Sequence, residues 1–561
     1  MTSHPVGASA SSARLPDIAA RALTGALGRS PVNATYLGDH ARDSLLDDPS
    51  AYAADQRAAE LRALLAELDV LVSGGADDQV DAGVLRTVLA AELLELTDLR
   101  EAEWNPMQHN PGGGLHSLLS RDFAPLPARL ESVGHRLAAI PEYLDAARTR
   151  LGVMSGIHLE TALGQLEGTI GIIDTEVPAA LAAAPQLRGS VEPAAAQARA
   201  ALVEHRDWLA AAADTATRDP QIGEDLFRIK LALALDTAFD PQSLLRRAES
   251  DLDRIHAQII EQAGAIAGVA RPDATTVREV LDRLAGDAPT DATILGLCRN
   301  ALTATTEFVR AHDLVTVYDD AVDVVEMPEI DRGVAVAYCR PNGPLESAAL
   351  PTEYAVSPTP TDWSREQVDS FYREYNAHML QNLTVHEAMP GHALQLMHAN
   401  RYRGRTPVRT VWWSGSFVEG WAVYTEELMA ERGFRSEVSE SAATALRMQQ
   451  LKMQLRTTIN AILDIRFHCG DLDEAGAMEL MLGRGFQERG EAAGKWRRVQ
   501  LSSTQLCTYY VGYTEVRDVA TDLRAAHPEW GERQVHDAML AHGSPPARHL
   551  RTLLGLPAAD A

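Results

Sequence analysis

The chain has 561 residues, of which 46% are hydrophobic, so it can bury a sizeable core and is not a disordered polypeptide. Its formal net charge is −27, from 51 basic and 78 acidic residues, which excludes nucleic acid or an anionic membrane as the main partner because both require a basic surface. By length alone, roughly two to four domains are expected, although a single large helical body with two lobes also fits.

Residues 1–14 are rich in Ser and Ala and predict a disordered tail. Residues 15–325 predict a helical scaffold lobe. Its clearest apolar stripe has spacings of three and four residues and consists of Leu245, Ala248, Leu252, Ile255 and Ile259. Pro141 is expected to begin a helix, because proline fits the first turn.

Extended segments interrupt the helices near residue 332. RGVAVAYC, residues 332–339, is short and contains β-branched and aromatic residues, so it predicts a strand. RPNGP then predicts a turn, and LPTEYAVSP predicts a second strand. We therefore expect a small sheet near residues 332–357. It would open a catalytic lobe over residues 326–561, packed intimately against the scaffold lobe.

The cysteines are far apart in the sequence and form no CxxC pair. They are Cys298, Cys339, Cys469 and Cys507. This spacing predicts neither a disulfide framework nor a cysteine-ligated zinc site. The N-terminus lacks a basic region followed by an apolar run, and no apolar window of about eighteen residues occurs. We therefore expect a cytoplasmic protein without a transmembrane helix.

The segment TVHEAMPGHALQ places His386 and His392 six residues apart. In a straight helix this spacing turns the imidazoles about 120° away from each other, so they would not bind one ion. The ring of Pro390 would collide with the carbonyl of His386, and Gly391 reaches backbone angles closed to other residues. We therefore predict that Pro390 and Gly391 break the helix and bring His392 beside His386 on a metal ion.

A zinc site with two histidines needs a third protein ligand and an open position for water. Glu419 lies downstream on a predicted helix with a stripe of aromatic residues, and zinc accepts a carboxylate beside imidazole. Glu426 shares a helix face with Glu419 and could orient a ligating histidine from behind. His378 and His398 are alternative ligands.

The segments HEAMPGHALQ and FVEGWAVYTEEL resemble the signature of a bacterial family, domain of unknown function 885. ILDIRFHCGD and RVQLSSTQLCTYYVGYTEV resemble two further motifs of that family, although Ser503 and Thr504 replace its Pro-Gly. The matched positions in these motifs are Asp464, His468, Arg498, Gln505, Tyr509 and Gly512. VHDAMLAHGSPPARHL resembles the closing helix of the family. The specific motifs lie in roughly the last 180 residues. The first three hundred residues resemble the family only in being predicted helical.

That family looks like a distant relative of helical zinc peptidases such as thimet oligopeptidase, angiotensin-converting enzyme and carboxypeptidase Taq. The resemblance implies a mainly α fold with two lobes around a deep channel and a small sheet along its edge. It also implies His386, His392 and Glu419 as zinc ligands and Glu387 as the general base.

Hydrolysis would form an oxyanion on the substrate carbonyl, which needs a hydrogen-bond donor besides zinc. The resemblance makes Tyr509 our first candidate for this donor, and Tyr510 and Tyr513 are rivals. Asp464 and His468 are four residues apart, so the carboxylate can fix the imidazole tautomer and keep His468 ready to donate to substrate.

Other matched residues are expected to bind substrate. Arg498 could hold a substrate C-terminal carboxylate, and Gln505 and Tyr513 are further candidates. The strand before the His-Glu segment could pair with an extended peptide by edge addition.

These features predict a zinc metallopeptidase that hydrolyses short peptides. A zinc hydrolase of a non-peptide amide or ester is an alternative, because the same site serves both reactions. A non-catalytic helical binding protein with a vestigial site is another, although Glu387 argues against it. The expected substrate is a peptide or small amide, and the sequence leaves the oligomeric state open.

Overall fold

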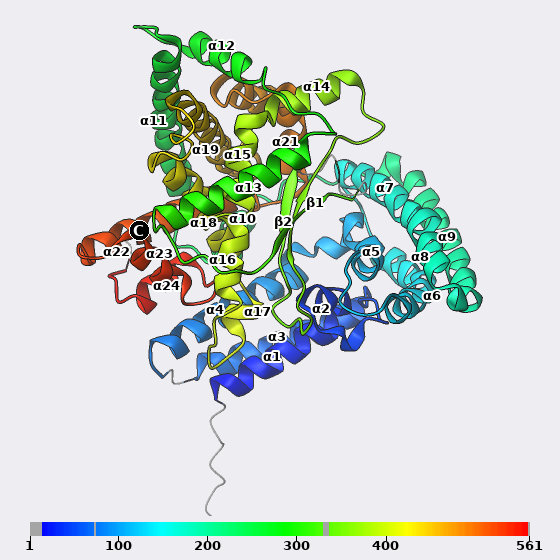
Figure 1. Cartoon of the computed structure of the whole chain (residues 1–561). Helices are drawn as coiled ribbons and strands as arrows, with labels where there is room; N and C mark the ends of the chain where they lie inside the picture. The colour runs from blue at the N-terminus through cyan, green and yellow to red at the C-terminus, as the bar shows by residue number, and fades with distance from the viewer. Residues whose placement is uncertain (1–13, 72–73, 329–331, 333–335, 559–561) are drawn as a thin grey trace, which may run out of the picture.

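The computed structural model describes residues 14–71, 74–328, 332 and 336–558. Helices dominate these residues, and their strands form a single small sheet (Figure 1). The predicted mainly α fold is confirmed. The expected disordered tail lies outside the described residues apart from Arg14.

Most of the N-terminal helices contribute to one of two hydrophobic clusters. The N-terminal helices are α1 (Leu15–Arg29), α2 (Pro31–Leu37), α3 (Ala51–Asp69), α4 (Ala76–Leu94), α5 (Gly112–Ser120), α6 (Leu126–Arg150), α7 (Gly156–Gly171), α8 (Val177–Ala183) and α9 (Arg188–Ala211). Leu61 and Leu85 lie in the cluster of α1, α3 and α4, and Leu137 and Leu202 lie in the cluster of α5 to α9. Figure 1 shows these groups at one end and along one side of the molecule.

The helix that contains Pro141 does not begin there. α6 runs from Leu126 to Arg150, straight through Pro141. Leu137, Ile140 and Leu144 are fully buried on either side of the proline. The apolar contacts of this face hold the helix together although Pro141 removes a backbone hydrogen bond. The prediction of a helix start at Pro141 was therefore wrong.

The next helices share a core with the C-terminal part of the chain. They are α10 (Glu224–Ala234), α11 (Pro241–Ala267), α12 (Ala274–Leu284) and α13 (Ile294–Ala311). Phe227 of α10 and Ile255 of α11 belong to the same buried cluster as Ile459 of the long helix α19 (Glu440–Cys469). The division into two lobes near residue 325 stays a prediction, and this core crosses it.

The sheet begins earlier than the sequence indicates. Its strand order is β1-β3-β2, with β1 (Val322–Glu326) parallel and β2 (Ala337–Arg340) antiparallel to β3 (Thr352–Val356). The expected range of 332–357 therefore missed β1, whose sequence VDVVE carries acidic residues that are depleted in strands. Part of the predicted strand 332–339 lies outside the described residues. Among those described, β2 is an edge strand.

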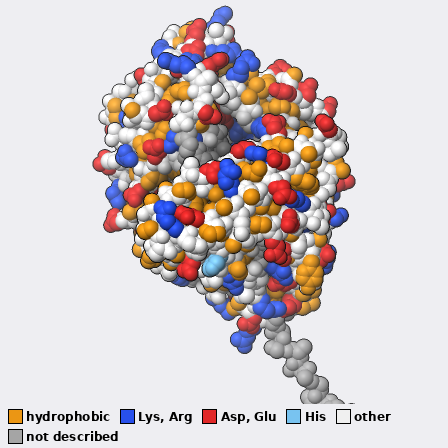
Figure 2. Space-filling model, turned by 90° about the vertical axis from the view of Figure 1, so that its right-hand side faces the viewer, with side chains coloured by type: hydrophobic (Ala, Val, Ile, Leu, Met, Phe, Trp, Pro, Cys, Tyr) orange, Lys and Arg blue, Asp and Glu red, His pale blue; other side chains and the backbone are white. Residues whose placement is uncertain are grey.

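The remaining helices surround the His-Glu segment. They are α14 (Arg365–Glu374), α15 (Ala377–Glu387), α16 (His392–Ala399), α17 (Val408–Val411), α18 (Gly415–Glu431), α20 (Glu474–Met478), α21 (Arg489–Leu501), α22 (Cys507–Ala526), α23 (Glu532–Leu540) and α24 (Ala547–Leu553). The face of the molecule shown in Figure 2 is hollowed near its centre, with charged side chains of both signs around the hollow. None of the helices in the described ranges is long and apolar enough to cross a bilayer.

Two glycines let α18 and α22 pack backbone to backbone. A Cβ on Gly420 would overlap the carbonyl group of Gly512, and a Cβ on Gly512 would overlap the carbonyl oxygen of Ser416. Only glycine lacks the atom that would push the helices apart. This contact fixes the height and rotation of α18, the helix that carries Glu419.

Gly420→Ala should therefore destabilise the protein by at least the roughly 1–3 kcal/mol typical of overpacking, because the backbone of α22 cannot move aside as a side chain can. The measurement is the midpoint of thermal unfolding. Gly164→Ala in α7 is the matched control, since a Cβ there meets nothing within 4 Å. Equal midpoints for the two variants would contradict the close packing.

Candidate metal centre

The helix that carries the His-Glu pair breaks where the sequence predicts. α15 ends at Glu387, and α16 begins at His392. Between them the N–H of Gly391 donates to the carbonyl oxygen of Val385 at 2.9 Å. A Cβ on Gly391 would overlap the carbonyl oxygens of Val385 and His386, so this turn requires glycine.

The turn is also held from α18. The indole N–H of Trp421, which is fully buried, donates to the carbonyl oxygen of Pro390 at 2.8 Å. Trp421 lies two residues after Glu419 in the chain. From its sequence position Trp421 is predicted only to belong to an apolar stripe, whereas in the structure it ties the turn to the helix of the third candidate ligand.

The break brings the three candidate ligands together. The ring centroids of His386 and His392 are 4.6 Å apart. Glu419 Oε2 lies 3.4 Å from His386 Nε2 and 3.5 Å from His392 Nε2. Ligand atoms at about 2.0–2.2 Å from a tetrahedral zinc ion are roughly 3.3–3.6 Å apart, so these separations fit the donor set that zinc prefers.

The carboxylate of Glu419 is suited to a cation. Its Oε2 atom is buried and, despite two imidazole nitrogens close by, has no well-aligned hydrogen bond. Burial raises the pKa of Glu419, but the charge of His392 and the interactions with both imidazoles outweigh burial and hold that pKa below its usual value. A buried anionic oxygen facing two imidazole nitrogens is the environment that a divalent ion would satisfy.

Behind His386 lies the carboxylate of Glu426. His386 Nδ1 contacts Glu426 Oε1 at 2.7 Å, and the side-chain amide of Asn382 donates to Glu426 Oε2 at 2.5 Å. These contacts fix the imidazole with Nε2 toward Glu419, which is the orienting role predicted for Glu426. Asn382 was missed, although it precedes His386 by four residues and so lies on the same helix face.

Glu387 lies between the ligands and the edge of the sheet. It is 7% exposed, and its Oε2 atom has no hydrogen-bond partner. Burial raises the pKa of Glu387, while the charges of His392 and His386 and a hydrogen bond with the backbone of Cys339 oppose that rise. A carboxylate with an elevated pKa is suited to accept and return a proton.

The environments of the three candidate tyrosines differ. The hydroxyl of Tyr510 donates to Asp251 at 2.7 Å, and that of Tyr513 donates to Glu427 at 2.7 Å. The hydroxyl of Tyr509 accepts a hydrogen bond from Arg498 at 3.3 Å, which leaves its own proton free to donate. These contacts favour Tyr509 over its rivals as a donor to an oxyanion.

Asp464 and His468 hold the loop before α22. Asp464 accepts the backbone N–H of Thr504 at 3.1 Å and that of Cys507 at 3.0 Å. His468 Nε2 contacts the carbonyl oxygen of Ser502 at 3.0 Å and lies 3.7 Å from Asp464. Burial lowers the pKa of His468 to about 4, so its imidazole is neutral. Their contacts with the loop were not anticipated, and a contact of His468 with substrate stays a prediction.

The other candidates occupy separate places. His378 contacts Asp287 at 2.9 Å, and His398 contacts the carbonyl oxygen of Thr316 at 2.8 Å, so neither joins the cluster of His386, His392 and Glu419. Arg498 forms no ion pair among the described residues and bonds to Tyr509. Gln505 borders a different cavity, between α7, α10 and the loop before α22.

The fold and this cluster define a mainly helical protein with a candidate His-His-Glu metal centre. The chain belongs to the family described as "Bacterial protein of unknown function (DUF885)", whose model matches residues 31–554. No curated protein matches it.

Two solved structures share the fold, and each is described as a "putative lipoprotein". The one from Shewanella oneidensis, of unknown function, is 28% identical with a TM-score of 0.81, and the match covers 97% of this chain and 100% of that chain. The one from Colwellia psychrerythraea is 16% identical with a TM-score of 0.79, and the match covers 96% and 98%.

Glu419→Ala should lower the zinc content of protein purified after exposure to zinc, because two imidazoles alone bind zinc weakly. Elemental analysis by mass spectrometry measures this content. Glu431→Ala, an exposed position on the same helix, is the matched control. An unchanged zinc content in Glu419→Ala would assign the third ligand elsewhere.

Proposed function

We propose that this protein is a zinc-dependent metallopeptidase that hydrolyses short peptides. The convergence of His386, His392 and Glu419, with ligand atoms within 4.8 Å of one another, carries the proposal. Glu387 directly follows the first ligand and is not needed as a ligand itself. A zinc ion held there would lower the pKa of bound water and polarise a substrate carbonyl.

The residues of the chain then have defined tasks. Glu387 takes the proton of the attacking water and passes it to the leaving amine, because a buried carboxylate with a raised pKa holds that proton reversibly. Glu426 and Asn382 keep His386 oriented. The free proton of the Tyr509 hydroxyl is available to the oxyanion that forms on the former carbonyl oxygen.

The edge strand β2 supports a peptide substrate. Val336 is hydrogen-bonded to Ser357 of the segment that continues β3, at 2.8 Å. Backbone groups alternate in direction along an antiparallel strand, so the N–H and C=O of Ala337 and Cys339 point away from β3. The backbone of Cys339 bonds with Glu387, and the adjoining edge offers ladder positions to an extended peptide beside the general base.

The same centre would also hydrolyse a non-peptide amide or ester. Within the described part of the chain no further strand pairs with the outer edge of β2, and this edge favours peptides over these substrates. Digestion of a peptide library by the zinc-loaded protein tests the proposal. Cleavage of esters or non-peptide amides, with no cleavage of any peptide, would replace the peptidase proposal with the alternative hydrolase. A distant relation to the helical zinc peptidases would then lose its functional support.

We propose a cytoplasmic location from the dispersed cysteines, all of which are free thiols. Both structural neighbours are described as a "putative lipoprotein". Fractionation of cells that express the native gene separates a cytoplasmic from a membrane-attached location, and recovery of this protein with membranes would overturn the cytoplasmic assignment.

Glu387→Gln should retain zinc and lose peptide hydrolysis by about 10²–10⁴-fold, because glutamine keeps the shape of the side chain and cannot accept the proton. Turnover is measured on a cleaved library peptide, together with the zinc content. A variant with full zinc and near-normal turnover would show that the base is another group.

Arg498→Gln should weaken cleavage of peptides with a free C-terminal carboxylate about tenfold more than cleavage of C-terminally amidated peptides. Both peptides lose the contact of Arg498 with Tyr509, but only the free acid also loses a charge-assisted hydrogen bond. The measurement is kcat/KM on matched free-acid and amide peptides. Arg497→Gln is the control, because Arg497 lies on the same helix and binds Glu160 and Thr161 instead. Equal losses on both peptides would refute a carboxylate contact.

A further inference from the structure

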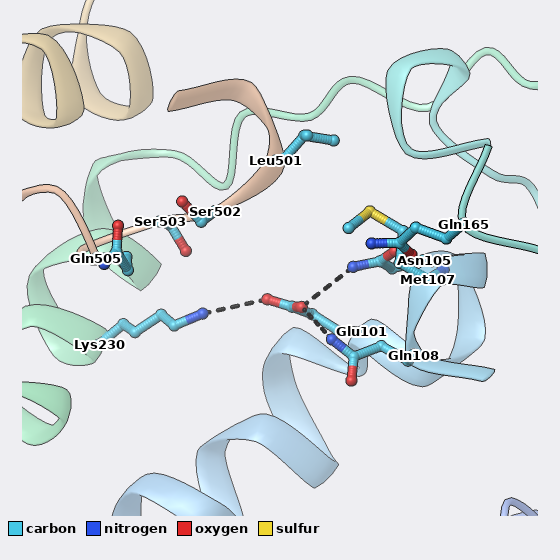
Figure 3. Close-up of a pocket in the computed structure, with 10 residues that line it drawn as sticks. All are labelled: Glu101, Asn105, Met107, Gln108, Gln165, Lys230, Leu501, Ser502, Ser503 and Gln505. Carbon is cyan, nitrogen blue, oxygen red and sulfur yellow. Dashed lines mark hydrogen bonds and ion pairs between the residues drawn. The ribbon is translucent and has the colours of Figure 1, made fainter. Parts of the chain in front are cut away.

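A cavity of about 360 Å³ lies away from the cluster of candidate zinc ligands. Residues from η3 (Glu101–Glu103), η4 (Pro106–His109), α7, α10 and the loop of residues 501–505 border it, as Figure 3 shows. Four carboxamides, from Asn105, Gln108, Gln165 and Gln505, are among the lining side chains. No step of the proposed hydrolysis uses this cavity.

One wall of the cavity is fixed in place. Asp464 and His468 bind the backbone of Thr504 and Ser502, respectively. Thr504 has a positive φ of 63°, which turns the chain sharply before Gln505. Because the buried side chains of Asp464 and His468 hold the loop, a ligand would not have to order Ser502 and Gln505 when it binds.

Several hydrogen-bond donors around the cavity are already paired. The side-chain amides of Asn105 and Gln108 both donate to Glu101, at 3.5 and 3.3 Å. The hydroxyl of Ser502 donates to the carbonyl oxygen of Arg498 at 3.1 Å. Lys230 donates to Glu101 at 3.1 Å, and Figure 3 shows its chain crossing one side of the cavity to reach that carboxylate.

Acceptors remain available. Gln505 Oε1 is buried and has no hydrogen-bond partner. The hydroxyl oxygen of Ser502 can still accept a hydrogen bond, because the hydroxyl only donates to the carbonyl oxygen of Arg498. A ligand that brings N–H donors into the cavity can therefore pair them with these two oxygens.

The charges around the cavity point to a cation. Lys230 lies 3.1 Å from Glu101 and 3.7 Å from Glu95, so two carboxylates share one ammonium group. Burial, followed by the charge of Glu101, raises the pKa of Glu95 to about 7. A second cation would balance both carboxylates.

We propose that this cavity binds a primary ammonium group, with Glu101 supplying the charge and Gln505 and Ser502 accepting its N–H donors. The group can come from a small amine, a lysine side chain or the N-terminus of a peptide. This site does not depend on the proposed hydrolase activity, since its binding is measured without turnover.

Isothermal titration of the Glu387→Gln full-length protein with three probes tests the chemistry of the ligand. Butylamine carries charge and N–H donors, tetramethylammonium carries charge alone, and 1-butanol carries neither a charge nor an N–H donor. Butylamine should bind about tenfold or more tightly than either control, because it alone combines a charge with N–H donors. Equal binding of all three, or of none, would overturn the proposal.

Variants locate the site. Glu101→Gln should weaken butylamine binding on the order of tenfold or more, while Glu103→Gln, on the same short helix but outside the cavity lining, should not. Lys230→Gln should strengthen it, since it frees both carboxylates for the ligand. The gain distinguishes recognition from damage to the fold. Loss of butylamine binding in Lys230→Gln, or binding of acetate instead by the unmodified cavity, would refute ammonium recognition.

Peptide probes distinguish the possible sources of the ammonium group. Triglycine is compared with N-acetyl-triglycine and with N-acetyl-lysine amide, whose only ammonium is on the side chain. Binding of triglycine alone assigns the site to peptide N-termini, and binding of the lysine derivative assigns it to side chains. Failure of both ammonium-bearing probes, with butylamine bound, would restrict the site to small amines and exclude a role in peptide recognition.

Discussion

The candidate centre depends on one backbone turn, the break between α15 and α16 at Gly391. There the chain passes so close to the carbonyl oxygens of Val385 and His386 that no side chain fits. Without this break the six-residue spacing would keep the imidazoles of His386 and His392 apart around the helix axis. The ring separation of 4.6 Å between those two histidines is therefore a property of the turn.

The turn is supported by close packing that extends across the C-terminal helices. Trp421 of α18 holds the carbonyl of Pro390, and Gly420 next to it packs against the backbone of Gly512 in α22. A shift of α22 would move α18 and with it Glu419, because packed backbones transmit displacement. The positions of the candidate ligands thus rest on contacts that contain no ligand atoms.

α22 also connects the candidate centre to the proposed ammonium site. The loop before α22 is bound by Asp464 and His468, and it lines the cavity with Gln505. The first turn of α22 carries Tyr509. In a chain with a net charge of −27, both places gather carboxylates around a position for a cation. At the candidate centre the remaining partners are imidazoles, which suit a metal ion, whereas the cavity offers carboxamide and hydroxyl acceptors, which suit N–H donors.

The sequence by itself determined the helical fold, the break at Pro390–Gly391 and the cluster of His386, His392 and Glu419, because helical periodicity, proline and glycine act locally and short motifs retain their spacing. Local patterns failed where tertiary contacts override propensity: burial carries α6 through Pro141, and the acidic strand β1, which pairs with β3 along its length, was missed. Only the tertiary structure decided that Asn382 donates to Glu426. It also decided that the hydroxyls of Tyr510 and Tyr513 donate to carboxylates while that of Tyr509 does not. Finally, it brought Glu101, Lys230 and Gln505 around one cavity. Glu101, Lys230 and Gln505 lie more than a hundred positions apart, and all these contacts follow from how the helices pack, which no local pattern records.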